Sequence, residues 1–309
     1  MPLSVDETIN KTSQALVDQL QAIFGKHPGF RPGTFTPSAE ASKLSSAPHF
    51  NNSSIPIKAR FSSSTGIPTI PDNDANANPR GMAVRFDLGG RHHTDIIAHS
   101  VPLFPTRTGA EFLEMLRAIA ASATAAVQGI SPSPVEKFFE THPHAYKFAT
   151  YPKPSPDSFA TEQYFGVNAF KFVNGEGKET FVRYTLQPGA GVKTLSDDEA
   201  REKSATYLFD ELPKRLEAGP VVFKLLGQIA EEGDVTDDHT QEWPEERKKV
   251  ELGTIEIKEI LPVQESLREQ KHIIFDPIPR VQGVEATADP LLEIRAAVYL
   301  ISGRQRRAA

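Results

Sequence analysis

The sequence predicts a single α+β domain organised around an antiparallel β-sheet or β-barrel. Several short segments alternate apolar and polar side chains with a period of two, and glycine-rich turns separate them, which is typical of antiparallel strands. Helical patterns occur in blocks between groups of strands. No internal repeat or clean linker divides the 309 residues, which suffice for one large core. We therefore treat residues 1–309 as one domain.

The N-terminal part, residues 1–54, is expected to form a helix and an extended arm. Apolar side chains in residues 5–24 follow helical spacing, and Ser4 with Glu7 forms a capping box. The arm is rich in Pro, Gly, Ser and Asn, with a short strand expected near residues 33–35.

The central part, residues 55–261, is expected to form the barrel and its inserted helices. Residues 66–79 form a turn-rich loop, and a break or kink is expected at Pro213. The apolar run 221–231 is interpreted as a buried strand, with a helix left open. Strands are expected at 55–62, 81–88, 92–98, 163–173, 179–187, 221–231 and 250–261, and helices at 110–128, 134–142 and 196–218.

Composition excludes several classes of site. The net charge of −6 and the pI of about 5.9 do not favour a nucleic-acid partner, which would require a basic surface. The absence of cysteine excludes disulfides, zinc–thiolate sites, thiol nucleophiles and iron–sulfur clusters. Any metal must therefore be held by His, Tyr or carboxylate side chains, or arrive inside a cofactor.

The sequence also carries expectations about location. No apolar run reaches the length of a membrane span, so no membrane partner is expected. The first residues are acidic and then amphipathic, unlike a signal peptide, and residues 304–309 do not form a peroxisomal address. We expect a cytoplasmic protein.

The C-terminal part, residues 262–309, is expected to be a wrapping loop followed by one helix. Asp289 suits the N-cap of this helix and Pro290 its first turn. Arg295 and Tyr299 are four residues apart and share one face. A guanidinium beside a phenol favours the phenolate, which is a suitable ligand for ferric haem. Taken alone, such a pair is more often a structural contact.

Five stretches in chain order add to that pair. Together they cover most of the chain and resemble the haem catalases, and among them the short catalase-related peroxidases that contain little more than the barrel. The stretches are 59–63 (ARFSS), 78–86 (NPRGMAVRF), 168–178 (NAFKFVNGEGK), 242–253 (EWPEERKKVELG) and 295–299 (RAAVY).

The resemblance implies an eight-stranded antiparallel barrel with flanking helices and an extended N-terminal arm. It also implies haem b, with its iron, as the cofactor. Tyr299 would be the proximal metal ligand, on a proximal haem-ligand helix, and Arg295 its charge partner, which keeps the ligand anionic.

The resemblance assigns further cofactor-binding residues. Arg60 would bind a haem propionate, because a guanidinium suits a carboxylate, and Ser62 belongs to the same strand. Arg306 and Arg31 would be further propionate partners. For Arg306, near the end of the chain, a solvated surface charge is an equally good interpretation.

The sequence departs from the family on the distal side. The family's distal histidine, which moves a proton between the peroxide oxygens, lies between the arm arginine and a Gly-aromatic-Phe strand. Here Arg31 and Pro32 run directly into residues 33–35, so that segment and its histidine are missing. A genuine loss and a reading frame that omits a segment both stay open. The loss predicts an open barrel edge and a widened distal side.

His99, or its neighbour Ser100, falls where the family has a distal asparagine. We consider His99 a weak substitute for the catalytic base, while a strand-end histidine with a local hydrogen bond is the other interpretation. His27 is a weaker candidate.

These observations predict a haem-dependent oxidoreductase. It would be a catalase-like peroxidase that decomposes hydrogen peroxide or organic hydroperoxides in the response to oxidative stress, impaired by the missing distal segment. The alternatives are a non-catalytic haem-binding protein and a fatty-acid hydroperoxide isomerase. An organic electron donor and a homo-oligomer are left open as partners.

Overall fold

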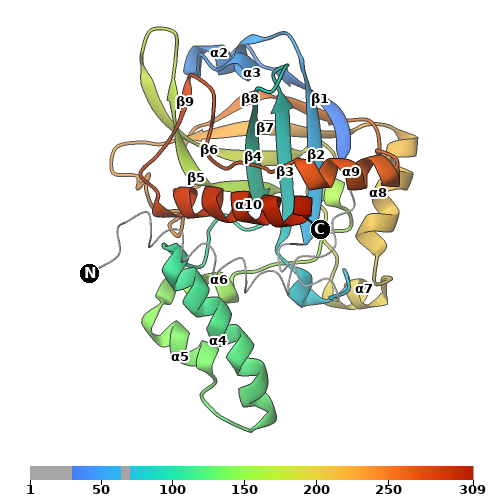
Figure 1. Cartoon of the computed structure of the whole chain (residues 1–309), viewed down its shortest axis with the longest axis vertical. Helices are drawn as coiled ribbons and strands as arrows, with labels where there is room; N and C mark the ends of the chain where they lie inside the picture. The colour runs from blue at the N-terminus through green and yellow to red at the C-terminus, as the bar shows by residue number, and fades with distance from the viewer. Residues whose placement is uncertain (1–29, 64–69, 309) are drawn as a thin grey trace.

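The computed structural model describes residues 30–63 and 70–308 (Figure 1). Within them, eight antiparallel strands close into a barrel, as the sequence predicted. Each strand pairs with the next along the chain, and the last pairs with the first. The strands are β1 (Arg31–Pro37), β2 (Ile55–Ser63), β3 (Arg80–Asp87), β4 (His93–His99), β5 (Tyr164–Val173), β6 (Glu179–Pro188), β7 (Val221–Ile229) and β8 (Lys249–Ile257).

Alternation along the strands divides the side chains between the barrel interior and its outer face. In β2, Ile57, Ala59 and Phe61 are buried in the main core, while the intervening Lys58 and Arg60 lie on the outer face. The core is filled by aromatic and branched side chains from every strand of the barrel, and each fully buried one contributes about 1.5–3 kcal/mol.

The predicted open edge at β1 was wrong. β1 pairs with β2 from Arg31 to Phe35 and with β8 from Gly33 to Pro37, so both of its edges are covered. The short strand around Gly33 is therefore long enough to form hydrogen-bond ladders with both β2 and β8. A Cβ atom on Gly33 would lie 2.2 Å from the Glu256 carbonyl oxygen, so glycine permits this close approach.

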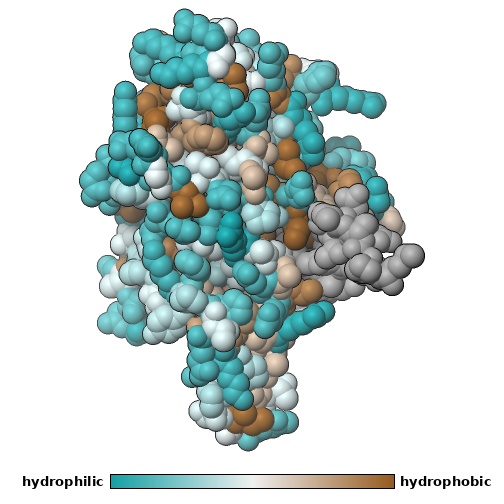
Figure 2. Space-filling model, turned by 90° about the vertical axis from the view of Figure 1, so that its left-hand side faces the viewer, coloured by the Kyte–Doolittle hydropathy of each residue, from teal (hydrophilic) through white to brown (hydrophobic). Residues whose placement is uncertain are grey.

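A helical lobe is inserted between β4 and β5. It consists of α4 (Gly109–Val127), α5 (Pro134–Thr141) and α6 (Pro143–Thr150), and it projects from the barrel (Figure 1). Capping boxes at Thr108 and Ser133 begin the first two helices. Figure 2 shows the lobe in profile, with apolar colour near its free end.

The insertion leaves little direct pairing between the strands on either side of it. In the described part of the chain, β4 and β5 share one register pair, His99 with Phe165. By contrast, β3 and β4 share seven.

The predicted helix 196–218 is two helices, α7 (Asp197–Glu202) and α8 (Tyr207–Ala218). The break falls before α8, and Pro213 lies inside it. Short elements that the sequence did not predict are α2 (Ala41–Leu44), α3 (Pro48–Asn51), η1 (Ala75–Ala77) and η2 (Phe159–Thr161). The predicted N-terminal helix lies outside the described residues.

The C-terminal segment wraps the outer face of the barrel. The region expected to be a loop contains α9 (Val263–His272) and β9 (Val284–Ala286), which pairs with β5. The final helix, α10 (Pro290–Ala308), crosses in front of β2–β4 in Figure 1. It packs on α4, because a Cβ on Gly109 would lie 2.5 Å from Ile294 Cδ1. None of the described helices has the length and apolar character that crossing a membrane requires.

Candidate functional site

Arg295 and Tyr299, the pair predicted on the C-terminal helix α10, lie side by side. The Asp289 carboxylate accepts the Leu291 amide hydrogen at 3.0 Å, so it caps the helix as expected. One turn apart, the Arg295 guanidinium carbon lies 5.9 Å from the centre of the Tyr299 ring.

The surroundings of Tyr299 favour its phenolate. Burial alone would raise the pKa of Tyr299, but the charge of Arg295, a hydrogen bond from it and the charge of Arg60 together lower that pKa below its ordinary value. Arg60 lies on β2, a different element from α10, and acts on the phenol through its charge. Two arginines from different elements therefore make Tyr299 lose its proton more readily than a free phenol does.

Behind Arg295 lies a buried hydrogen-bond chain that the sequence did not reveal. Arg295 Nη1 donates to Asn168 Oδ1 at 2.7 Å, and Asn168 Nδ2 donates to Asp289 Oδ2 at 2.7 Å. Asp289 in turn contacts His239 Nδ1 at 2.8 Å. Asn168 belongs to β5 and His239 to the loop between β7 and β8, so no spacing in the sequence joins them to α10.

The outer face of β2–β4 is apolar next to this pair. Ala83 and Ile97 occupy it in register with Arg60, and Phe275 packs over them. The guanidinium carbon of Arg60 lies 5.0 Å from the centre of the Phe275 ring.

A buried ion pair holds the covering segment in place. Arg85 Nε and Nη2 lie 2.8 and 2.7 Å from the two Asp95 carboxylate oxygens. The same carboxylate accepts the backbone amide hydrogen of Asp276 at 2.7 Å. Phe275 is therefore fixed against the barrel by its neighbour in the chain.

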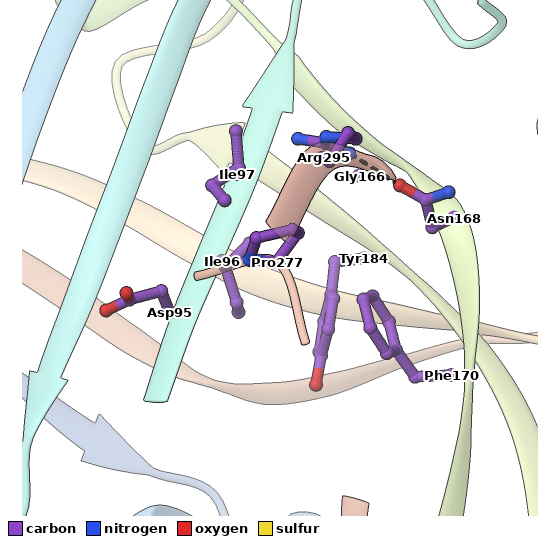
Figure 3. A pocket seen from close by; sticks show the side chains of 9 residues that line it. All are labelled: Asp95, Ile96, Ile97, Gly166, Asn168, Phe170, Tyr184, Pro277 and Arg295. Carbon is purple, nitrogen blue, oxygen red and sulfur yellow. Dashed lines mark hydrogen bonds between the residues drawn. The ribbon is translucent and has the colours of Figure 1, made fainter. Parts of the chain in front are cut away.

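A small cavity lies between α10 and strands β4–β6 (Figure 3). Ile97, Gly166, Asn168 and Arg295 are among the residues that line it, and Arg295 reaches across to Asn168 in the figure. Its volume is about 10 Å³, which is room for roughly one water molecule.

His99, the weak candidate base, ends β4 on the same outer face as Ile97. Burial, followed by the positive charge of Arg295, lowers its pKa to about 3. Its Nε2 atom has no hydrogen-bond partner among the described residues, and the rings of Phe104 and Phe148 flank it at 6.2 and 6.3 Å. His99 is therefore a neutral imidazole near pH 7.

The remaining candidates are placed less favourably. Arg31 is 3% exposed, and burial lowers its pKa to about 10. It pairs with Ala59, so strand alternation puts it on the opposite face of the sheet from Arg60. Ser62 is half-buried on the outer face of β2.

Two candidates cannot be placed. The backbone of Arg306 belongs to α10, but its side chain, like all of His27, lies outside the described residues. Within the described part of the chain, no group of three or more His, Cys, Asp or Glu side chains is placed to hold a metal ion.

Comparison with known proteins identifies the family. The catalase family model matches residues 28–309, nearly the whole chain. The chain belongs to the catalase family. The resemblance noted in the sequence and the fold that it implied are therefore both confirmed.

Within the catalase family, the chain is similar to two short relatives. It is 33% identical over 307 residues to a catalase-related peroxidase of Mycolicibacterium paratuberculosis, covering 96% of this chain and 95% of that protein. It is 30% identical over 306 residues to a catalase-related peroxidase of Synechococcus elongatus, covering 96% and 88%.

Longer catalases match only in part. A catalase of Triticum aestivum is 27% identical over 290 residues, and the match spans 58% of its length. A bacterial catalase structure superposes with a TM-score of 0.76 at 20% identity, covering 99% of this chain and 62% of that one, which supports the fold alone.

Proposed function

We propose that this chain is a haem-dependent, catalase-like peroxidase that decomposes hydrogen peroxide or organic hydroperoxides, and that Tyr299 would be the protein ligand of the iron. Its membership of the catalase family supports the reaction class. The observation that carries the proposal is the placement of the buried Tyr299 one helical turn from Arg295, whose guanidinium carbon lies 5.9 Å from its ring centre, and the charges of Arg295 and Arg60 also lower the pKa of Tyr299. A phenolate is the form of tyrosine that binds ferric iron.

The side chains present suit a haem. Tyr299 would supply the anionic oxygen ligand and Arg60 a partner for a propionate. Ala83, Ile97 and Phe275 would supply an apolar surface for the macrocycle. When bound, the haem would supply the redox-active iron at which a peroxide reacts.

The cavity next to Arg295 is much smaller than such a group requires. Ligand pockets usually measure about 300–1,000 Å³. The cavity at Arg295 measures about 10 Å³. We therefore expect α10 to move away from β4 when haem is loaded, while Tyr299 and Arg295 keep their relative positions on the same helix.

Proton transfer is the part of the reaction that the described residues support least. Heterolytic cleavage of the peroxide O–O bond requires a base that takes a proton from one oxygen and returns it to the other. A base works best when its pKa is near the working pH, but that of His99 is about 3. We therefore propose that turnover is impaired.

Haem titration followed by absorption spectroscopy tests the proposal. Wild-type protein should develop the spectrum of a ferric haem bound to tyrosinate, and Tyr299→Phe should not. Tyr146→Phe is the matched control, because Tyr146 is 56% exposed on α6, away from the site. The proposal fails if the wild type stays colourless with excess haem, or if Tyr299→Phe and the wild type give the same spectrum.

A non-catalytic haem-binding protein is the second candidate, and the low pKa of His99 favours it. Oxygen release from hydrogen peroxide, and oxidation of an organic donor by organic hydroperoxides, separate the two. A binder would show the tyrosinate spectrum without either activity.

A further inference from the structure

An open groove lies on the outer surface of the barrel, between α9 and strand β2, which are neighbours in Figure 1. Its volume is about 500 Å³. That is within the range of ligand pockets, about 300–1,000 Å³, and far above the volume of the cavity at Arg295. The residues that line the groove are Lys58, Glu265, Arg268, Glu269, His272 and Ile273.

Four of the polar side chains come from one face of α9, because they follow one another at helical spacings of three or four residues. They are Glu265, Arg268, Glu269 and His272. Three of them, all but Glu269, are exposed and form no hydrogen bond or ion pair with another described residue. The groove therefore presents a guanidinium, an imidazole and a carboxylate whose binding positions are open.

The fourth, Glu269, joins α9 to the barrel. Its Oε1 atom lies 2.5 Å from Nζ of Lys58 on β2. Its Oε2 atom is buried and has no hydrogen-bond partner among the described residues. A carboxylate oxygen that has lost water without gaining a hydrogen is unfavourable. A ligand that brings an O–H or N–H group to Glu269 would therefore be favoured.

These groups select the chemistry of a ligand. The Arg268 guanidinium suits a carboxylate, with which it can form two parallel hydrogen bonds. The Glu269 carboxylate suits a hydroxyl hydrogen better than an ammonium group, because the positive charge of Lys58 beside it would repel a second cation. Ile273 adds an apolar wall for a ring. The combination fits a small aromatic acid that carries hydroxyl groups.

The groove adjoins the surface proposed for the macrocycle. Ile273, which lines the groove, also packs against the cluster that contains Ala83 and Phe275. Lys58 and Arg60 lie two residues apart on the outer face of β2, which is a separation of roughly 7 Å along the strand. A molecule bound in the groove would therefore lie close to the residues that suit a haem.

We propose that this groove binds a small hydroxylated aromatic acid, with its carboxylate on Arg268 and a hydroxyl group on Glu269, and that this acid is the organic electron donor of the peroxidase. The first half stands without a cofactor. The second half rests on the proposed function.

The reaction balances for a dihydroxy acid. The donor loses two electrons and two hydroxyl protons, so both O–H bonds break and the ring becomes a quinone. The organic hydroperoxide takes up the two electrons and two protons, its O–O bond breaks, and an alcohol and water are formed. The electrons pass between the two substrates by way of the bound haem.

Calorimetric titration of the haem-free full chain with protocatechuate, a dihydroxybenzoate, tests binding. The wild type should show one saturable site, and benzoate and catechol, which each lack one half of the probe, should bind more weakly. Arg268→Gln should weaken protocatechuate binding at least about tenfold, because a charge-assisted contact is lost. Arg201→Gln is the matched control, because Arg201 lies on α7 with its side chain 69% exposed.

NMR of the histidine rings locates the site. The ring signals of His272, assigned with His272→Gln, should shift as protocatechuate is added. Those of His144, which is exposed on α6, should not. No saturable binding, equal binding by wild type and Arg268→Gln, or a His272 signal that stays in place at saturation would refute the binding site.

Turnover of tert-butyl hydroperoxide by haem-loaded protein tests the role of the ligand. Arg268→Gln should raise KM for protocatechuate about tenfold, with a smaller change for catechol, which has no carboxylate. Arg201→Gln should change neither value. A wild-type KM for protocatechuate in Arg268→Gln would refute the donor role even where calorimetry supports binding. A wild type that binds no haem would refute the proposed function and the donor role together, while the calorimetry and NMR results would still decide the binding site.

Discussion

Asp289→Asn should destabilise the protein strongly, although the two side chains have nearly the same shape. Asparagine is a good N-cap, so the bond to the Leu291 amide can be kept. What is lost is the negative charge beside His239, which has 0% exposure. The substitution therefore separates the helix cap from the contact between the carboxylate and His239.

The size of the effect follows from burial. Removing one partner of a fully buried, charge-assisted contact costs up to about 3–5 kcal/mol, because the remaining polar groups stay in the interior uncompensated. Losing only the cap would cost about 1 kcal/mol. Since domains are stable by about 5–15 kcal/mol, the larger value is a substantial part of the total.

Urea denaturation of haem-free protein, followed by circular dichroism, measures this difference. Asp198→Asn is the control, because Asp198 forms a surface pair with Arg201 in which the side chains are 87% and 69% exposed. It should change the unfolding free energy by less than about 0.5 kcal/mol. If Asp289→Asn costs no more than about 1 kcal/mol with an intact spectrum, the Asp289 carboxylate stabilises the fold only as a helix cap.

Three further predictions concern the barrel, pH and turnover. Gly33→Ala should lower the melting temperature by several degrees, because its Cβ would meet the Glu256 carbonyl at 2.2 Å, whereas Gly175→Ala has open space and should be neutral; equal melting temperatures would contradict the tight β1–β8 pairing. Burial raises the pKa of Glu162 from 4.5 to about 7, so the stability it contributes is present below about pH 4.5 and lost as pH rises to about 7. Glu162→Gln should remove this decline in the unfolding free energy, whereas the exposed Glu176→Gln should retain it; a decline that persists in Glu162→Gln would assign it to another group. Oxygen release by haem-loaded protein should be about 10²–10⁴-fold slower than that of a catalase with a distal histidine, and an equal rate would show that another group replaces it.

The strands of the barrel could be predicted because their sequences alternate between apolar and polar side chains over enough residues. β2, for example, alternates between core and outer face along most of its length. The sequence did not predict α9, whose first residues follow Pro262 and whose composition is mostly polar. β9 has only three residues and forms through pairing with β5, which local sequence does not encode.

The part of the candidate site whose residues lie close together in the sequence could be predicted. Arg295 and Tyr299 share a helical face, and their spacing alone suggested an interaction. The chain through Asn168 and His239 was not predictable, because its residues come from a strand, a loop and a helix end. His99 was identified as a weak base from its position, but only its burial beside Arg295 gives its pKa of about 3.

Strands β4 and β5 share a single register pair, so in the described part of the chain their junction is the most weakly paired in the barrel. Few cross-strand hydrogen bonds need to break there. Local opening should therefore cost less free energy at this junction than between the other pairs of strands. His99 belongs to this junction, and Gly166, which follows its partner Phe165, lines the cavity at Arg295. The fold therefore places the strand junction that separates most easily beside the proposed site. A large ligand could enter there while the other strands of the barrel stay paired.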